Sequence, residues 1–254
     1  MTAKQKLVHA LANKKQRDTR NLFVGEGTKT VGELLRSFRC VTAMATAEWA
    51  DANQGMLSQV NNVEIVTYDE LRKTSLQKTP QGVIGVFSKG EPKDVDLKAA
   101  ENGLCLALDS VQDPGNLGTI IRLANWFGMS TIVCSKTTAD VYSPKVVQAT
   151  MGALAGIDIL YTDLRMYLES LMPSVPIYGT FLDGTNVYDT TLSPNGVIVM
   201  GNEGNGISAA VAEVVTKRLY IPPYNANLKT TESLNVGVAA AVICAEFRRR
   251  FPRV

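Results

Sequence analysis

The stretch from residue 197 to residue 250 restricts the fold more than any other part of the chain. It consists of short apolar runs that stop at glycine, proline or small polar residues. Residues 197–200 predict a buried strand, because four β-branched and apolar residues that end at a glycine are too few for a helix. Residues 219–221 repeat this plan, and Ser233 is predicted to cap a helix that follows. Loops that follow strands in this way are where α/β proteins bind small ligands.

The rest of the chain alternates strand and helix patterns. Residues 104–108, 131–134, 157–160 and 177–181 predict strands, with helices over 119–127, 144–151 and 164–171. This alternation predicts a mostly parallel sheet with helices on both faces. Residues 1–89 form a smaller α/β unit, and a polar stretch follows. We therefore predict an N-terminal domain at 1–89, a linker at 90–101 and a second domain at 102–254.

Composition excludes several classes of protein. No apolar run approaches the length of a membrane span, and lysines interrupt the N-terminal apolar residues, so we expect a cytoplasmic protein without membrane contact. The four cysteines lack CxxC spacing and are expected to be buried, reduced thiols. The single histidine argues against multi-histidine metal sites, and we expect no metal.

A basic segment near the N-terminus has two interpretations. The net charge of +2 is too small to indicate nucleic-acid binding by itself. Lys14, Lys15, Arg17 and Arg20 nevertheless lie within seven residues. They form either a solvated helix face or a set of contacts to RNA phosphates.

Three loops, at residues 113–118, 201–206 and 222–233, each follow a predicted strand and would lie along one edge of the sheet. Residues 201–206, GNEGNG, do not have the spacing of a dinucleotide fingerprint. This weakens the interpretation of the chain as a Rossmann-type oxidoreductase.

The three loops carry ordered motifs that resemble the signatures of the SpoU (TrmH-like) branch of the SPOUT RNA methyltransferases. The motifs are N-x-G-x-x-x-R-x-A from Asn116, G-x-E-x-x-G-I from Gly201, and I-P followed by E-S-L-N-V from Ile221. The resemblance covers the second unit from end to end. The first unit, through KKQRDTRNLFVGEG and KTPQGVIGVF, is similar to the ribosomal-protein-like substrate-binding domain often found in this family.

The resemblance implies an α/β fold whose C-terminal parallel-sheet SPOUT domain contains a deep trefoil knot. It implies S-adenosylmethionine as the cofactor, methyl transfer to a ribose 2′-hydroxyl of structured RNA, and a homodimer. Ribosomal RNA is favoured over transfer RNA, because the additional N-terminal domain usually accompanies ribosomal substrates. A non-catalytic RNA-binding factor on the same scaffold is the alternative, although such a factor would not need Arg122, Glu203 and Asn235.

The matching positions give a set of candidate residues. The predicted catalytic residues are Arg122, Asn116, Glu203, Ser233 and Asn235. The predicted cofactor-binding residues are Thr180, Met200, Gly201, Asn202, Gly206, Ile221 and Leu234. Structural roles remain open beside these: Arg122 as a surface residue, Glu203 as an anchor for its loop, Asn116 and Ser233 as caps. The loop at 223–231 is longer than is usual in the family, and its role is left open.

Overall fold

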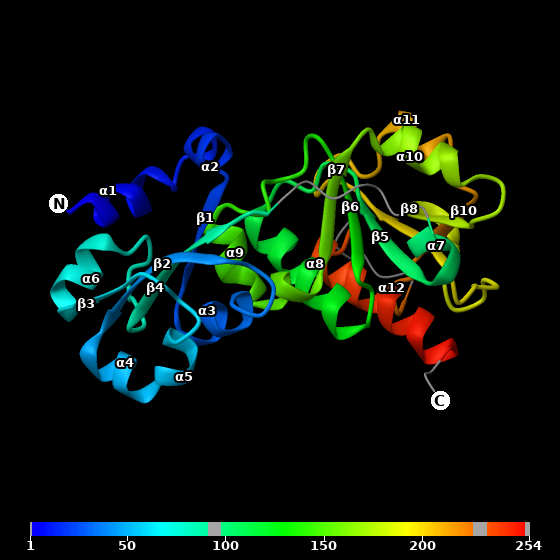
Figure 1. Cartoon of the computed structure of the whole chain (residues 1–254). Helices are drawn as coiled ribbons and strands as arrows, with labels where there is room; N and C mark the ends of the chain where they lie inside the picture. The colour runs from blue at the N-terminus through cyan, green and yellow to red at the C-terminus, as the bar shows by residue number, and fades with distance from the viewer. Residues whose placement is uncertain (1, 91–97, 226–232, 252–254) are drawn as a thin grey trace. The chain divides into compact units, whose positions relative to one another are not determined.

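A computed structural model describes residues 2–90, 98–225 and 233–251 (Figure 1). By their contacts the residues form two compact units, one of residues 1–92 and 140–156, the other of residues 93–139 and 157–254. Within the described ranges, no helix is both long enough and apolar enough to cross a membrane. All four cysteines are buried and none forms a disulfide, so their predicted burial is confirmed.

The first unit is built on a four-stranded mixed sheet with the order β1-β4-β2-β3. Its strands are β1 (Leu22–Glu26), β2 (Cys40–Thr46), β3 (Val63–Val66) and β4 (Val83–Ser88). Strand β4 pairs antiparallel with β1 and with β2, and β3 runs parallel to β2. The helices from the N-terminal part of the chain are α1 (Ala3–Ala10), α2 (Lys14–Arg20), α3 (Thr28–Leu34), α4 (Ala47–Ala52), α5 (Gln54–Leu57) and α6 (Tyr68–Thr74).

Residues 140–156 also belong to the first unit, although they lie between two strands of the second unit in the sequence. They form α9 (Pro144–Thr150) and the 3₁₀ helix η1 (Ala153–Gly156). Ser143 caps α9, and Pro144 occupies its first turn. The ring of Tyr142 packs against Phe23, with centroids 4.9 Å apart. The contacts of residues 140–156 therefore add this segment to the first unit. The domain boundaries at residues 89 and 102 remain a prediction.

The second unit contains the predicted parallel sheet. Its strands are β5 (Leu104–Leu108), β6 (Thr131–Ser135), β7 (Asp158–Thr162), β8 (Ile177–Asn186), β9 (Gly196–Met200) and β10 (Lys217–Tyr220). Their order is β10-β8-β9-β5-β6-β7, and every neighbouring pair is parallel. The helices are α7 (Lys98–Asn102), α8 (Pro114–Trp126), α10 (Leu164–Leu171), α11 (Ala209–Ala212) and α12 (Val236–Arg250).

The starts of two helices differ from the prediction. Helix α8 begins at Pro114 rather than at residue 119, because the side chain of Asp113 accepts a bond from the Asn116 backbone N–H. Helix α12 is capped by Asn235, so the assignment of Ser233 as the cap was wrong. Strand β8 also continues beyond its predicted end at residue 181, and its pairing with β10 shifts register between Gly179 and Thr185.

The strand order places two of the predicted loops side by side. The chain enters the sheet at β5, adds β6 and β7 on one side, and then returns to the other side, where β8, β9 and β10 follow in the chain and β9 lies next to β5. Strands β5 and β9 are parallel neighbours, with Leu108 opposite Met200. The loops that leave their carboxyl ends therefore meet at a topological switch point, where open α/β sheets bind ligands.

Candidate active site

The loop after β9 is held in one shape by its own polar groups. Asn202 and Gly206 exchange two backbone hydrogen bonds of 2.9 Å. The side-chain oxygen of Asn202 accepts the N–H groups of Gly204 and Asn205 at 3.0 Å, while its amide nitrogen donates to the Ser110 carbonyl at 2.8 Å. One side chain thus folds the loop and ties it to the segment after β5.

Gly201 begins this loop, and the backbone passes so close that no side chain fits. A Cβ atom there would lie 2.3 Å from the carbonyl carbon of Gly206 and 2.4 Å from the nitrogen of Ile207. These are backbone atoms that cannot move without moving the loop. Gly201 is therefore required for the close return of the chain.

Glu203 links the loop to the start of α8. Its carboxylate accepts the N–H groups of Gln112 at 3.3 Å and Asp113 at 3.1 Å, and the side-chain amide of Asn116 at 3.0 Å. Burial alone would raise the pKa of Glu203, but the hydrogen bonds, first that from Asn116, outweigh it and lower the pKa below its ordinary value. The anchoring role that was left open for Glu203 is therefore present in the structure.

Asn116 connects Glu203 to Asn235. Asn116 donates its amide to Glu203 and accepts the amide of Asn235 at 2.9 Å. Asn235 in turn accepts the N–H groups of Gly237 and Val238, at 2.9 and 3.2 Å, as the cap of α12. The structure therefore brings together three predicted residues, one from each motif, in a single hydrogen-bonded chain.

Arg122 and Ser233 do not join this chain. Arg122 is exposed on α8 and forms no hydrogen bond or ion pair with any residue that the structure describes. Ser233 is exposed two residues before the cap of α12. The geometry leaves the guanidinium of Arg122 available for an external group.

The predicted cofactor residues lie on the elements that surround the β9 loop. Thr180 in β8 donates to the Val199 carbonyl at 3.3 Å, and Met200 is buried at the end of β9. Ile221 is half-buried after β10, and Leu234 is 48% exposed before the cap of α12. Residues 226–232, which include most of the unusually long loop, lie outside the described residues. Among the residues that the structure describes, no group of three or more His, Cys, Asp or Glu side chains could hold a metal.

Asp109 was missed by the sequence analysis. Its side chain is 4% exposed and accepts the Ser208 N–H at 2.7 Å, so it fixes the far end of the β9 loop to the end of β5. The Ser110 hydroxyl donates to its other oxygen at 3.3 Å. The available signal was an aspartate directly after an apolar strand, where a buried carboxylate needs hydrogen-bond partners.

Family comparison agrees with the placement of the three motifs. The sequence profile described as the SpoU rRNA Methylase family matches residues 103–245, more than half of the chain. The chain belongs to the SpoU rRNA methylase family. A second profile, the MRM3-like substrate binding domain, matches residues 3–85. The resemblance inferred from the motifs is confirmed.

Individual relatives match this SpoU protein over nearly its whole length. The 23S rRNA (guanosine(2553)-2′-O)-methyltransferase RlmP of Bacillus subtilis is 31% identical, over 94% of this chain and 93% of RlmP. A TrmH-family structure from Porphyromonas gingivalis has 37% identity and a TM-score of 0.86, covering 98% of this chain and 99% of that one. An AdoMet-bound rRNA methyltransferase from Sinorhizobium meliloti has 28% identity and a TM-score of 0.84, covering 99% and 96%. The predicted fold class, a parallel-sheet SPOUT domain after a separate substrate-binding domain, is confirmed.

The basic segment of this SpoU chain forms α2, and its four cations differ in environment. Lys14, Lys15 and Arg20 are exposed. Arg17 is 3% exposed and forms an ion pair of 2.6 Å with Asp140, while donating to the carbonyls of Leu11 and Ala12 at 2.8 Å. The prediction that Arg17 contacts RNA phosphates is therefore corrected: Arg17 joins α2 to residues 140–156 inside the first unit.

Proposed function

We propose that this protein transfers a methyl group from S-adenosylmethionine to a ribose 2′-hydroxyl of ribosomal RNA. The observation that carries the proposal is the Glu203–Asn116–Asn235 chain, which joins all three motifs at the switch point of the sheet. The activity of RlmP, which aligns over 94% of this chain, supports the reaction and the class of RNA.

The residues around the β9 loop fit S-adenosylmethionine. Gly201 provides a backbone surface without a side chain, and loops at strand ends offer N–H and C=O groups to an adenine ring. We assign cofactor binding to Thr180, Met200, Gly201, Asn202, Gly206, Ile221 and Leu234. When bound, the cofactor supplies an electrophilic methyl group. The AdoMet-bound structure of the Sinorhizobium meliloti relative supports this assignment.

The chain's own residues must position the ribose and stabilise the charge that develops on its oxygen. Within the described network, Asn116 and Asn235 each use one of two amide N–H groups, which leaves one on each for ribose oxygens. Arg122 supplies a permanent positive charge with a two-pronged donor geometry. Because guanidinium stays protonated at neutral pH, Arg122 orients the acceptor of the 2′-hydroxyl proton, a phosphate oxygen or a water molecule, rather than acting as the base. Ser233 is the remaining residue of the predicted catalytic set.

The remaining predictions belong to the same proposal. Lys14, Lys15 and Arg20 on α2 contact RNA phosphates, and residues 1–89 act as the substrate-binding domain. The C-terminal domain is knotted, as the family resemblance implies, and two copies form a homodimer in the cytoplasm.

Calorimetry tests this proposal against the two alternatives. S-adenosylmethionine should bind the wild-type protein and NADH should not. A non-catalytic RNA-binding factor would bind RNA without the cofactor, and an oxidoreductase would bind NADH. Mapping of ribose methylation in cells that lack the gene should then show one or a few unmodified positions in ribosomal RNA.

A further inference from the structure

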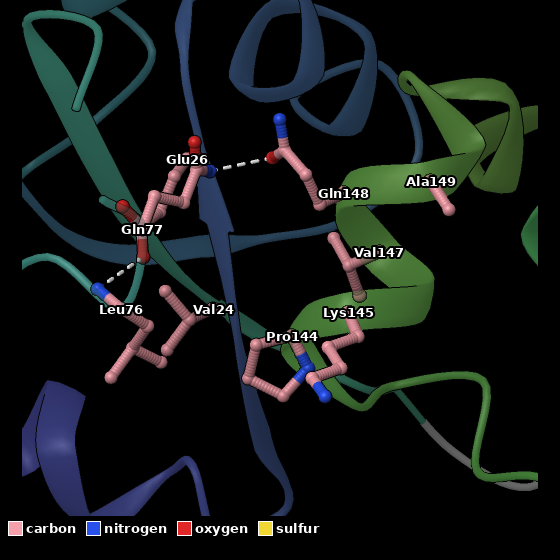
Figure 2. Close-up of a pocket in the computed structure, with 9 residues that line it drawn as sticks. All are labelled: Val24, Glu26, Leu76, Gln77, Pro144, Lys145, Val147, Gln148 and Ala149. Atoms are coloured by element: carbon pink, nitrogen blue, oxygen red, sulfur yellow. Dashed lines mark hydrogen bonds between the residues drawn. The ribbon is translucent and has the colours of Figure 1, made fainter. Parts of the chain in front are cut away.

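The first unit contains a pocket of about 300 Å³ that the proposed reaction does not use. The pocket is formed by β1, the residues that follow α6, and α9 (Figure 2). All of its lining residues belong to the first unit: Val24, Glu26, Leu76, Gln77, Pro144, Lys145, Val147, Gln148 and Ala149. The pocket therefore lies between the N-terminal part of the first unit and residues 140–156, which come between β6 and β7 in the sequence.

Fixed polar groups line this pocket. Glu26 is 5% exposed; its carboxylate accepts the Ser75 hydroxyl and the Leu76 N–H, the latter at 2.9 Å. These two bonds leave further lone pairs on the carboxylate. The amide of Gln77 donates to the side-chain oxygen of Gln148 at 2.6 Å, so each glutamine orients the other (Figure 2).

Hydrogen-bonding capacity remains after these contacts. Among the described residues, the amide nitrogen of Gln148 and the amide oxygen of Gln77 have no hydrogen-bond partner. The pocket thus offers a donor and an acceptor near a buried carboxylate. Its other walls are apolar, with Val24 and Leu76 on one side and Pro144 and Val147 of α9 on the other (Figure 2).

These features select the class of ligand. A buried carboxylate disfavours a phosphate inside the pocket, because two anions repel at short range in a low-dielectric site. The apolar walls suit a flat ring, and the amide and carboxylate groups suit an edge with N–H and C=O groups. A nucleobase has both properties, and proteins that recognise RNA commonly bind bases that are splayed out of a loop. The exposed ammonium of Lys145 at the rim would meet the attached ribose-phosphate.

We propose that this pocket receives one unpaired nucleobase of the RNA substrate. The inference rests on the proposed function, because it takes the substrate to be RNA. The first unit would then recognise an unpaired base of the RNA in this pocket, in addition to contacting phosphates through Lys14, Lys15 and Arg20 of α2. Since α9 lies in the chain between β6 and β7, the bound base would engage a segment continuous with the catalytic sheet.

Filling the pocket tests this proposal. Ala149→Trp would occupy the space from α9, and Gln148→Ala would remove the paired amide without adding volume. The matched control is Ala52→Trp, at an exposed position on α4 of the same unit. The probe is an unmodified transcript of 23S rRNA in filter binding, with thermal melting to verify folding. Ala149→Trp should weaken RNA binding roughly tenfold to a hundredfold, the effect of losing one stacked base. Gln148→Ala should weaken it several-fold, Ala52→Trp should not, and calorimetric binding of S-adenosylmethionine should not change in any variant.

Several other results of these measurements would overturn the proposal. Wild-type affinity in a folded Ala149→Trp variant would overturn the proposal, and so would an equal loss in Ala52→Trp. If Ala149→Trp does not fold, wild-type affinity in Gln148→Ala overturns it instead. A free nucleotide is the other source of the same chemistry: tight binding of guanosine 5′-monophosphate with unchanged RNA affinity in the variants would assign the pocket to that ligand. A wild-type protein that binds neither S-adenosylmethionine nor RNA would reject the proposed function itself, whereas failure of the variants alone would reject only this pocket.

Discussion

The side-chain amide of Asn235 donates to the side-chain oxygen of Asn116 at 2.9 Å, across 119 positions of the sequence. The oxygen of the same Asn235 side chain caps α12. One residue therefore fixes the start of the last helix and the orientation of Asn116, which in turn holds Glu203.

Two substitutions of Asn235 should separate these roles. Asn235→Ala removes both, and loss of the cap alone should lower the free energy of unfolding by about 1 kcal/mol. Asn235→Asp keeps a good capping acceptor but cannot donate to Asn116, so stability should be retained while methyl transfer falls. Denaturant unfolding and single-turnover transfer measure the two effects, with Asn125→Ala at an exposed position of α8 as the control. Full activity in Asn235→Asp would show that the bond to Asn116 is not used.

Substitution of Gly201 should weaken cofactor binding. A Cβ atom at Gly201 would overlap the backbone of Gly206, whereas one at Gly204 would meet only the Asn202 side chain at 3.7 Å. Overpacking of this kind typically costs about 1–3 kcal/mol, so Gly201→Ala should weaken calorimetric binding of S-adenosylmethionine roughly fivefold to a hundredfold. Gly204→Ala is the matched control and should bind normally. Equal affinities in the two variants would place the cofactor elsewhere.

The cations of α2 should divide into two classes. Replacing Lys14, Lys15 and Arg20 with alanine should weaken RNA binding and reduce its salt dependence, by roughly 0.7–0.9 in slope for each lost phosphate contact. Arg17→Ala should instead lower the free energy of unfolding by about 3 kcal/mol, because the carboxylate of Asp140, which is only 14% exposed, loses its cationic partner. Filter binding over a range of salt and denaturant unfolding check the two results. An unchanged slope in the triple variant would restore the solvated-face interpretation.

The end of α12 should contribute stability that is sensitive to acid. The hydrogen bond from Arg249, with further contributions from Arg250, lowers the pKa of Glu246 from its ordinary 4.5 to about 2. The folded pKa is the lower one, so in this range the unfolded chain binds more protons and stability falls as the pH falls from 4.5 toward 2. Because Arg249 is 69% exposed, screening reduces the effect to about 1–2 kcal/mol. Glu246→Gln should make acid unfolding less steep, and Glu48→Gln, at an exposed position, should not.

The sequence was sufficient for features that depend on local pattern. The apolar runs before residues 109 and 201 predicted β5 and β9. Because three loops each follow a predicted strand, the sequence also predicted that the loops with Asn116 and Glu203 would lie along one edge of the sheet. Features that depend on residues far away in the sequence could not be predicted from local pattern. Ser233 and Asn235 are both good capping residues, and the position where α12 begins was not evident from the sequence.

Arg17 shows the same limit more clearly. The nearby cations Lys14, Lys15 and Arg20 are exposed, whereas its partner Asp140 lies 123 residues away. Nothing near Arg17 in the sequence indicates that it is buried. For the same reason α9, which sits between two strands of the parallel sheet in the sequence, could not be assigned to the first unit beforehand.

Transfer of labelled methyl groups to unmodified 23S rRNA, followed by alkaline hydrolysis, tests the proposed reaction most directly. Alkali cleaves RNA through the 2′-hydroxyl, so a ribose 2′-O-methyl group protects the adjacent phosphodiester and its label appears in a dinucleotide. We predict label in one such alkali-stable dinucleotide. Under single-turnover conditions with saturating enzyme and cofactor, Arg122→Lys and Arg122→Ala should slow its formation by about a hundredfold to a thousandfold. Label recovered in mononucleotides, or no transfer at all by the wild-type protein, would contradict 2′-O-methylation.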